Sequence, residues 1–238
     1  MILAFESSAK PVSVAVYDTT LSSGKLLGQY FQNNGFSHSR TLMSMAESLL
    51  TNLGLKPADI GLVAVASGPG SFTGVRIGVS AAKGLAFGLD IPVCGVSTLE
   101  AMAWQLGVTE GCITCSVMDA RREQVYNALF EWRGSVLVRL CDDRALSIAE
   151  LAADLGKYDL PVMLVGDGVD VCKTGFAQID NTTLKDCRVA SELVRYQTAY
   201  GVALTAMCCE PVSATELEPF YLRPSQAERV RKEGTEGL

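Results

Sequence analysis

Short apolar runs alternate along the chain with segments of helical periodicity, which is the pattern of an α/β protein. In the first half, apolar runs bounded by turn residues predict strands at residues 2–5, 12–17, 26–32, 60–66 and 91–96. Apolar positions three and four apart predict helices at residues 37–53, 75–88 and 99–106. Gly54 stands where the first of these helices should end.

The same order of elements restarts near the middle of the chain. Glu6 and Asp119, 113 positions apart, each follow an apolar run and precede another one six residues later. The predicted elements of the second half are strands at 113–118, 125–130 and 161–165, and helices at 146–155 and 191–209. Two copies of one unit predict a duplicated α/β fold. We expect subdomains at residues 1–106 and 107–238, with a last helix that can pack back on the first subdomain.

A glycine-rich stretch, VASGPGSFTGVRIG, joins a predicted strand to a predicted helix. It lacks the GxGxxG spacing of dinucleotide-binding loops and the GxxxxGK[ST] spacing of phosphate-binding loops. Thr73 is a reasonable N-cap, and Arg76 lies in the first helical turn, so the free N–H groups there favour an anion. Glycines also permit tight turns and close packing. Both interpretations, an anion site and a structural turn, remain open.

The helix that follows has small residues at regular spacing. Gly74, Gly78 and Ala82 recur every four residues, and glycine within a helix costs about 1 kcal/mol relative to alanine. Close approach of another element would compensate. That element belongs either to the core of this chain or to a partner protein.

Carboxylates at the two predicted hairpins are the other candidates for chemistry. Glu6 and Asp119 either bind a metal–phosphate group in a cleft between two facing halves or accept hydrogen bonds from their own turns. Together with the two glycine turns, they define a candidate anion or nucleotide cleft. Its residues are Glu6, Ser7, Ser71, Thr73, Arg76, Asp119, Gly166 and Gly168.

The single histidine limits the possible catalytic sites. His38 begins a predicted helix, and Leu42 occupies the position where a second metal-binding histidine would stand. No GxSxG segment presents a nucleophilic serine to His38, which favours a surface or interface histidine over a catalytic one. Cys112 and Cys115 form a lone CxxC within a predicted strand, where a structural role is favoured over metal binding or redox chemistry.

Composition and charge limit the classes of protein to which the chain can belong. The 238 residues include 20 Lys and Arg against 26 Asp and Glu, a net charge of −6, so strong direct binding to nucleic acid is not expected. Eight cysteines in a chain of this length fit reduced thiols better than a disulfide framework. No apolar run reaches the length of a membrane span, and the start has no basic region of a signal peptide, so we expect a cytoplasmic protein.

Long motifs give the chain a family resemblance. SGPGSFTGVRIG, continued by AAKGLAFGLDIPVCGVSTLEA, resembles the TsaB (YeaZ) family, whose members take part in making threonylcarbamoyl-adenosine next to the anticodon of bacterial tRNAs. VMDARREQVYNALF, VGDG and LEPFYLRP also match in order, so the resemblance covers nearly the whole chain. It implies the actin-like ATPase (ASKHA) fold, two duplicated α/β halves around a degenerate cleft.

The resemblance also implies partners. TsaB proteins pair with a catalytic paralogue, TsaD, on which a separate ATPase, TsaE, docks, and they form a competing homodimer. The contact uses helices of the first half, which here implies the interface residues His38, Leu42, Met45, Val75, Gly78, Val79 and Ala82. On this basis, Ala82→Glu should break pairing while leaving the fold partly intact.

One position departs from the family pattern. The first hairpin usually begins Asp-Thr-Ser in TsaB proteins, whereas this chain has Glu6-Ser7-Ser8. Without a second histidine, the glutamate does not restore the metal site of the catalytic paralogue, although residual ATP or ADP binding stays open.

The expected function is that of a non-catalytic partner in tRNA threonylcarbamoylation, without a cofactor and with tRNA held mainly by others. The alternatives are a peptidase or an actin-like ATPase that acts alone, and a homodimer with an independent regulatory role.

Overall fold

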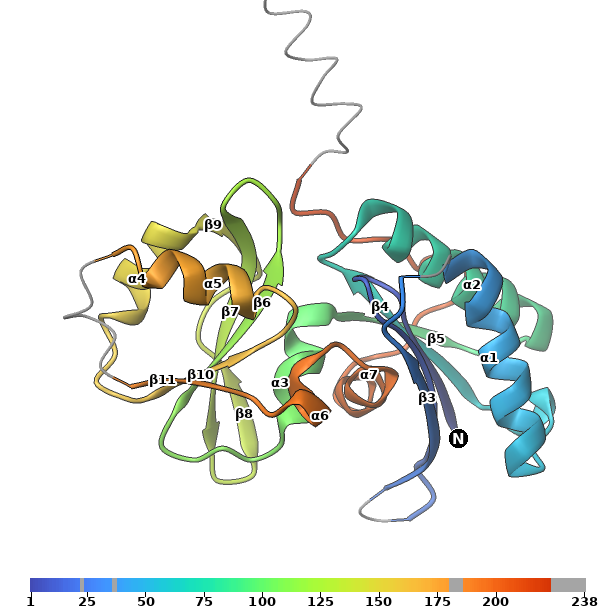
Figure 1. The fold of residues 1–238 in the computed structure, drawn as a ribbon. Coiled ribbons are helices and arrows are strands. Elements are labelled where there is room, and N and C mark those ends of the chain that lie inside the picture. Colours follow the sequence, from blue (N-terminus) through green and yellow to red (C-terminus); the bar gives the residue numbers. More distant parts are fainter. Residues whose placement is uncertain (22–23, 36–37, 180–185, 224–238) are drawn as a thin grey trace, which may run out of the picture.

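The computed structural model describes residues 1–21, 24–35, 38–179 and 186–223. The first sheet has the order β3-β2-β1-β4-β5 (Figure 1). Its strands are β1 (Ile2–Glu6), β2 (Val12–Asp18), β3 (Lys25–Gln32), β4 (Leu62–Gly68) and β5 (Val93–Ser97). β1 pairs antiparallel with β2 and parallel with β4, so it is the central strand.

The second sheet repeats this topology. Its order is β11-β10-β6-β7-β8, with β9 also paired to β7. The strands are β6 (Ile113–Asp119), β7 (Gln124–Arg133), β8 (Val136–Arg139), β9 (Arg144–Ser147), β10 (Val162–Val165) and β11 (Cys187–Val189). Central β6 pairs antiparallel with β7 and parallel with β10, as β1 does with β2 and β4. The predicted duplicated α/β fold of the actin-like class is therefore confirmed.

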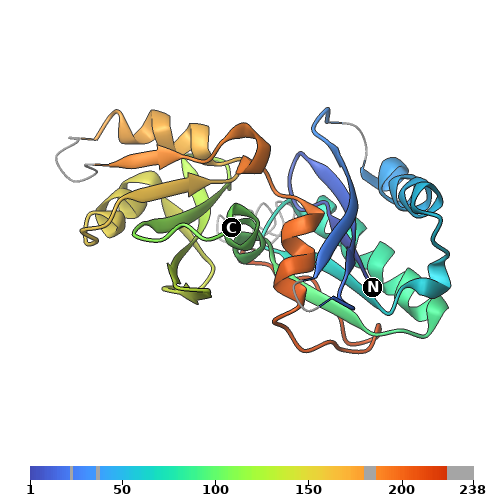
Figure 2. The same cartoon turned by 90° about the horizontal axis from the view of Figure 1, so that it is seen from below.

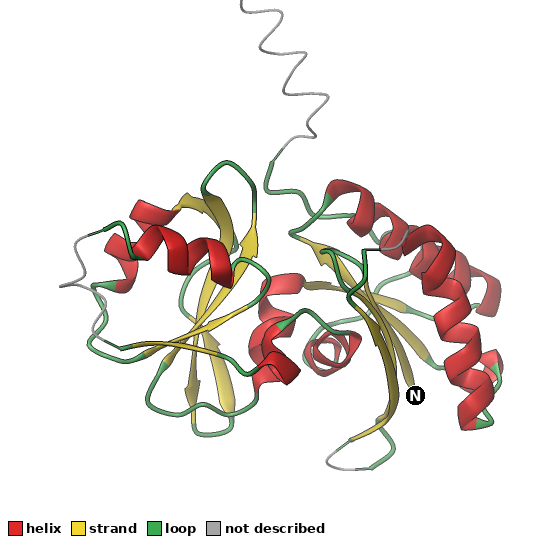
Figure 3. Ribbon diagram, in the orientation of Figure 1, coloured by secondary structure: helices red, strands yellow, loops and turns green. Residues whose placement is uncertain are grey.

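One face of each sheet is covered by helices of its own half (Figure 3). The helices α1 (His38–Leu53) and α2 (Phe72–Leu89) pack on the first sheet, where alternate residues such as Leu3 and Phe5 are fully buried. The helices α4 (Ile148–Leu155) and α5 (Val169–Phe176) pack on the second sheet. A short 3-10 helix, η1 (Pro57–Asp59), leads into β4.

The helices α3 (Thr98–Leu106) and α7 (Ala199–Ala206) lie between the two sheets (Figures 1 and 2). Leu99 and Met102 of α3 enter a core cluster with residues of the second sheet, whereas Val202 and Ala203 of α7 pack on the first sheet. Thus α7, which follows the second half in sequence, covers the inner face of the first.

The prediction of one continuous helix at residues 191–209 is wrong. It is divided into α6 (Glu192–Arg195) and α7, because Tyr196 and Thr198 adopt extended backbone conformations between them. Thr198 caps α7 by accepting a hydrogen bond from the N–H of Gly201. The predicted helix at 146–155 begins later, at Ile148, and its first residues belong to β9.

After α7 the chain returns along the first half as a C-terminal strap, residues 210–223. Val212 pairs with Val93 of β5, Leu217 is buried in the first core, and the N–H of Phe220 donates to the carbonyl of Ser67 at 2.7 Å. Lys83 of α2 donates to the carbonyl of Leu217 at 2.9 Å. The strap therefore runs along the first sheet from Val93, at the start of β5, to Ser67, near the end of β4, and is also bonded to α2. Among the described residues, no helix is long and apolar enough to cross a membrane.

Candidate functional site

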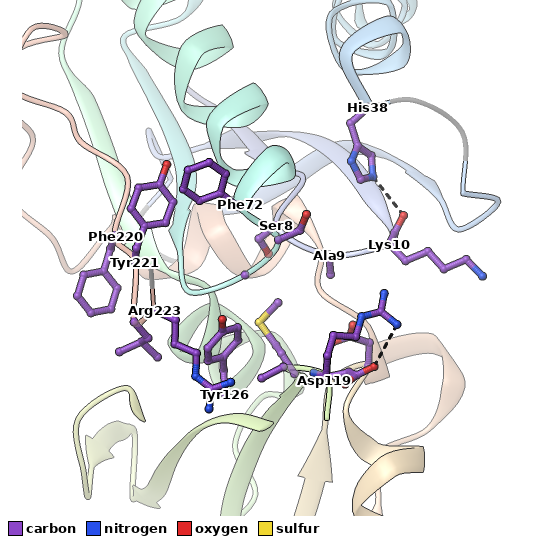
Figure 4. Close-up of a pocket in the computed structure, with 17 residues that line it drawn as sticks. Ser8, Ala9, Lys10, His38, Phe72, Asp119, Tyr126, Phe220, Tyr221 and Arg223 are labelled. Carbon is purple, nitrogen blue, oxygen red and sulfur yellow. Dashed lines mark hydrogen bonds and ion pairs between the residues drawn. The ribbon is translucent and has the colours of Figure 1, made fainter. Parts of the chain in front are cut away.

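A cavity of about 440 Å³ lies between the two halves, next to the turns that follow β1 and β6 (Figure 4). It is lined by residues 8–10, 38, 70–72, 118–121, 126, 167 and 220–223. The first half, the second half and the strap therefore all contribute walls. The lining carries the cations of Lys10, Arg121 and Arg223 and the carboxylates of Asp119 and Asp167.

Glu6 lies beneath this cavity and is fully buried. Its Oε1 accepts hydrogen bonds from both the N–H and the hydroxyl of Ser8, each at 2.6 Å, whereas its Oε2 has no partner. Burial raises the pKa of Glu6 to about 7, with a smaller contribution from the carboxylate of Asp167, although the Ser8 bonds oppose the shift. Burial therefore disfavours the charged form of this carboxyl group.

Asp119 repeats the same turn in an open setting. Its Oδ1 accepts a hydrogen bond from the N–H of Arg121 at 2.7 Å, two residues on, as Glu6 does from Ser8. The side chain of Asp119 is 28% exposed and its Oδ2 lies 3.7 Å from the Arg121 guanidinium. Asp119 therefore faces the cavity, as predicted for the cleft, but it is already engaged by its own hairpin.

Two glycines, Gly68 at the end of β4 and Gly166 directly after β10, bring the backbone close to neighbouring segments. Gly68 has φ +130° and Gly166 has φ +118°, both in the region that favours glycine. A Cβ atom would collide with the carbonyl of Phe220 at Gly68 and with the carbonyl of Val117 at Gly166. These glycines serve close packing, which favours the structural interpretation of the two turns.

Asp167 lies between the glycines of the second turn and was not predicted as a site residue. It lines the cavity, and its Oδ1 accepts a hydrogen bond from the amide of Gln197 at 2.7 Å. Burial raises the pKa of Asp167, and the nearby Asp119 carboxylate adds to the increase. Its position in VGDG, matching Pro69 in the first glycine turn, is the sequence signal that could have identified it.

The predicted cleft residues do not all face the cavity. Ser71 and Asp119 do, but Glu6, Ser7, Gly166 and Gly168 are buried beneath it. The Ser7 hydroxyl donates to the carbonyl of Gly74 at 2.9 Å, so it fastens the hairpin to α2 and is not available to a ligand. The N-cap of α2 is Ser71, not Thr73, because the chain already becomes helical at Phe72.

Thr73 and Arg76 point to a different surface, and Arg76 is held by aromatic side chains. Its guanidinium carbon lies 3.8 Å from the ring centre of Phe72, and its Nε donates to the hydroxyl of Tyr221 at 2.9 Å. Phe72 and Tyr221 stack with ring centres 4.8 Å apart. Arg76 therefore anchors the strap to α2, and it lines the groove described next and not the cavity between the halves.

The second surface is a groove of about 530 Å³ between α1 and α2. Its lining is mostly small or apolar and consists of Ser39, Leu42, Met43, Phe72, Thr73, Arg76, Ile77, Ser80 and Ala81. Met43 is 43% exposed, so a large apolar side chain of the groove faces solvent.

Most of the predicted interface residues belong to the core instead. Leu42, Val75, Gly78, Val79 and Ala82 are buried within the first core, so their side chains do not reach a partner surface, although Leu42 forms part of the groove floor. The spacing of Gly74, Gly78 and Ala82 reflects packing of α2 on the chain's own β1 hairpin and β4. Ala82→Glu would bury a carboxylate, so it cannot separate pairing from folding.

The two remaining interface candidates occupy intermediate positions. Met45 is partly buried against the first core. His38 is also partly buried and lines the cavity, where its Nε2 lies 3.2 Å from the carbonyl of Lys10. This hydrogen bond gives His38 a structural role at the start of α1, and no catalytic role is needed to account for its position.

The other sequence candidates are accounted for within the described residues. No group of three His, Cys, Asp or Glu side chains there is placed to hold a metal ion. Cys112 and Cys115 are buried without a disulfide, and Cys115 belongs to the second core. Residues 224–238, a polar tail for which the sequence predicts no binding role, lie outside the described residues.

Comparisons with known proteins place the chain in a family. Residues 34–229 match the family model described as TsaD, tRNA N6-adenosine threonylcarbamoyltransferase. The tRNA threonylcarbamoyladenosine biosynthesis protein TsaB of Bacillus subtilis is 35% identical over 172 residues, which cover 72% of this chain and 73% of that protein. The chain belongs to the TsaB family.

Two further similarities agree with this assignment. The TsaB protein of Haemophilus influenzae is 30% identical over 79% of this chain and 80% of its own length. The structure of YeaZ from Pseudomonas aeruginosa superposes with a TM-score of 0.75 and covers 93% of this chain and 99% of that one, at 23% identity. The structural match supports the fold, and the sequence matches support the family.

Proposed function

We propose that this TsaB-family chain is a non-catalytic partner of a TsaD-type enzyme in the formation of threonylcarbamoyl-adenosine in tRNA. Relatives of this family carry the name of that biosynthesis, and the chain matches the TsaD family model over most of its length. The observation that carries the proposal is the open groove between α1 and α2, which presents apolar side chains beside a cavity that lacks a prepared catalytic group.

The groove is the docking surface for the TsaD-type paralogue. Met43 lies on its α1 side, and Ile77 and Ala81 lie on its α2 side. The buried residues beneath, including Leu42 and Val79, fix the two helices on the sheet and keep the groove open. A paralogue with the same fold would present an equivalent helix pair, and apolar surface on both sides would be removed from water.

The cavity between the halves supports a non-catalytic role. Burial disfavours the charged form of Glu6, Asp119 is engaged by Arg121, and Asp167 is engaged by Gln197. His38 is occupied by a backbone carbonyl. None of these groups is arranged as a nucleophile and base within hydrogen-bonding reach of each other.

The other partners belong to the same proposal. A TsaE-type ATPase would dock on the assembled pair in the cytoplasm, and in isolation the same groove would pair with a second copy of this chain. Because the net charge is −6, tRNA would be held mainly by the partners. Any binding of ATP or ADP to the cleft would be residual.

Reconstitution tests the proposal directly. Labelled threonine is incorporated into tRNA with all components present or with only this chain omitted. Incorporation should collapse without this chain and return when it is added with an intact groove. Unchanged incorporation would overturn the proposal, and ATPase and peptidase assays of the isolated chain would then test the alternative functions.

A charge in the groove should weaken pairing without unfolding the chain. Met43→Asp places a carboxylate on an exposed apolar position, and we expect the dissociation constant for the TsaD-type partner to rise by about tenfold or more. Met207→Asp is the matched control, since Met207 is 48% exposed beyond the end of α7 and away from the groove. Equal loss of binding in both variants would argue against the groove.

A further inference from the structure

Two cysteines far apart in sequence meet at the edge of the first sheet. Cys94 lies in β5 and is 1% exposed, whereas Cys209 follows α7 and is partly buried against the same apolar cluster. The strap then pairs with β5 through two backbone hydrogen bonds between Val93 and Val212, of 2.9 and 2.8 Å. These bonds hold the segment containing Cys209 beside the strand that carries Cys94.

The two thiols share a hydrogen bond, and its direction can be assigned. Cys209 Sγ donates to the carbonyl of Thr205 at 3.4 Å, so its sulfur is the acceptor for the thiol of Cys94. This bond lowers the pKa of Cys209, although burial and the carboxylate of Glu100 oppose the change. The same bond, together with burial, raises the pKa of Cys94. Glu100 is itself paired with Arg139 at 2.7 Å.

We propose that Cys209 is a modification site for hydroperoxides and that Cys94 converts its oxidised form into a Cys94–Cys209 disulfide. The Cys209 thiolate attacks one peroxide oxygen, the O–O bond breaks, and the departing oxygen takes up a proton, which leaves a sulfenic acid on Cys209. Cys94 sulfur then attacks Cys209 sulfur. The S–S bond forms as the S–O bond breaks, and the hydroxyl leaves with the Cys94 proton as water.

The reaction balances without another reagent. The two thiols lose two electrons and two protons in total, and the peroxide becomes two molecules of water when it is hydrogen peroxide. Once Cys209 is a sulfenic acid, it is no longer a thiolate that accepts the Cys94 proton. The interaction that raised the pKa of Cys94 is thereby lost, which favours its attack.

The disulfide would connect β5 to the segment between α7 and the strap. Since Cys94 follows Val93 at the start of β5, oxidation would fasten the beginning of the strap to the edge of the first sheet. We expect the oxidised chain to have a higher Tm than the reduced chain, because the cross-link restricts the unfolded ensemble.

Peptide mapping tests the proposal in the full chain. Cys208 is the exposed neighbour of Cys209, so Cys208→Ser leaves one thiol in that segment and makes the assignment unambiguous. The variant is treated with limiting hydrogen peroxide, blocked with N-ethylmaleimide and digested with trypsin and chymotrypsin, which separates Cys94 from Cys112. A Cys94–Cys209 peptide that disappears with dithiothreitol is expected.

Cys187, exposed on β11, is the internal control. At pH 7, Cys209 should react with peroxide roughly tenfold faster than Cys187, since more of it is thiolate. In Cys94→Ser, or in Cys94→Ala if the first variant does not fold, dimedone should capture a lasting sulfenic acid on Cys209. The proposal fails if no linked peptide forms, if Cys209 reacts no faster than Cys187, or if the unmutated chain links Cys94 mainly to Cys208.

Discussion

The two hairpins at the cavity, Glu6–Val12 and Asp119–Val125, begin with the same carboxylate-to-backbone hydrogen bond and differ in burial. In each, a carboxylate accepts the N–H of the second residue after it, at 2.6 and 2.7 Å. Glu6 is nevertheless fully buried, whereas Asp119 faces the cavity. The duplication preserved the turn, and the surroundings decided what its carboxylate can do.

The difference comes from the helix that follows each glycine turn. In the first half, α2 has 18 residues, and its start is tied to the hairpin by bonds from Ser7 to Gly74 and from Ser71 to Ser8. In the second half, α5 has 8 residues, and Gly168 bonds to Val117 in β6 rather than to the hairpin. The N-terminal end of α2 therefore covers the first hairpin and closes that hairpin to solvent.

The backbone of the second hairpin is also less relaxed. Arg121, Arg122 and Glu123 have φ of 66°, 54° and 57°, a region that costs about 1–2 kcal/mol per residue without glycine. At the matching place the first hairpin has Ala9, which is buried and lies outside this region. The open hairpin thus contains strain that the closed one avoids.

The largest expected effect comes from alanine at the two glycines of positive φ. Gly166→Ala should lower the free energy of unfolding by about 3 kcal/mol or more, because the added Cβ meets the backbone of the central strand β6. Gly68→Ala should cost less, since its Cβ meets Phe220 in the strap, which can shift. Urea denaturation compares the two. Equal losses would mean that the strap is as firmly held as β6.

A smaller effect distinguishes the two carboxylates by pH. The pKa of Glu6 is about 7 when folded against 4.5 when unfolded, so the folded chain binds more protons between these values and loses stability as pH rises through them. The loss is on the order of 3 kcal/mol, at 1.36 kcal/mol per unit. Glu6→Gln should remove this dependence. Relative to the unmodified chain, the variant should therefore have a higher free energy of unfolding at pH 8 than at pH 5.

The measurement is the free energy of unfolding of both proteins from pH 5 to pH 8. Asp119→Asn is the matched variant in the open hairpin. If its curve departs from that of the unmodified chain as strongly as the Glu6→Gln curve does, burial of Glu6 is not the cause.

The smallest effect tests the strained turn. Arg122→Gly should raise the free energy of unfolding by up to about 1 kcal/mol, because relief of the left-handed conformation outweighs the flexibility of glycine. Ala9→Gly at the matching position should lower it by about 0.5–1 kcal/mol, since no strain is relieved there. Thermal unfolding shows whether each variant is more or less stable than the unmodified chain. A change in the same direction in both variants would contradict the strain assigned to the second hairpin.

The sequence predicted all five strands of the first sheet, the duplication and the two carboxylate turns, because these depend on local periodicity and on repeats. It did not predict the short strands β8, β9 and β11 or the helix α5 of the second half. The family resemblance put the interface on α1 and α2, but the structure buries Val75, Val79 and Ala82 in the first core. Because α2 is apolar on nearly all sides, periodicity could not distinguish its core face from its groove face. Asp167 and the strap residues Tyr221 and Arg223 were missed as cavity residues, because contacts with segments distant in sequence place them there.

By itself, the sequence determined the duplicated α/β unit and the family, since apolar spacing and long motifs are properties of the chain. Only the tertiary structure decided that Glu6 is closed off while Asp119 is open, and that Met43 rather than Ala82 faces the groove. It also brought Cys94 and Cys209 together. Burial depends on what packs over a residue from distant segments, and local pattern does not contain that information.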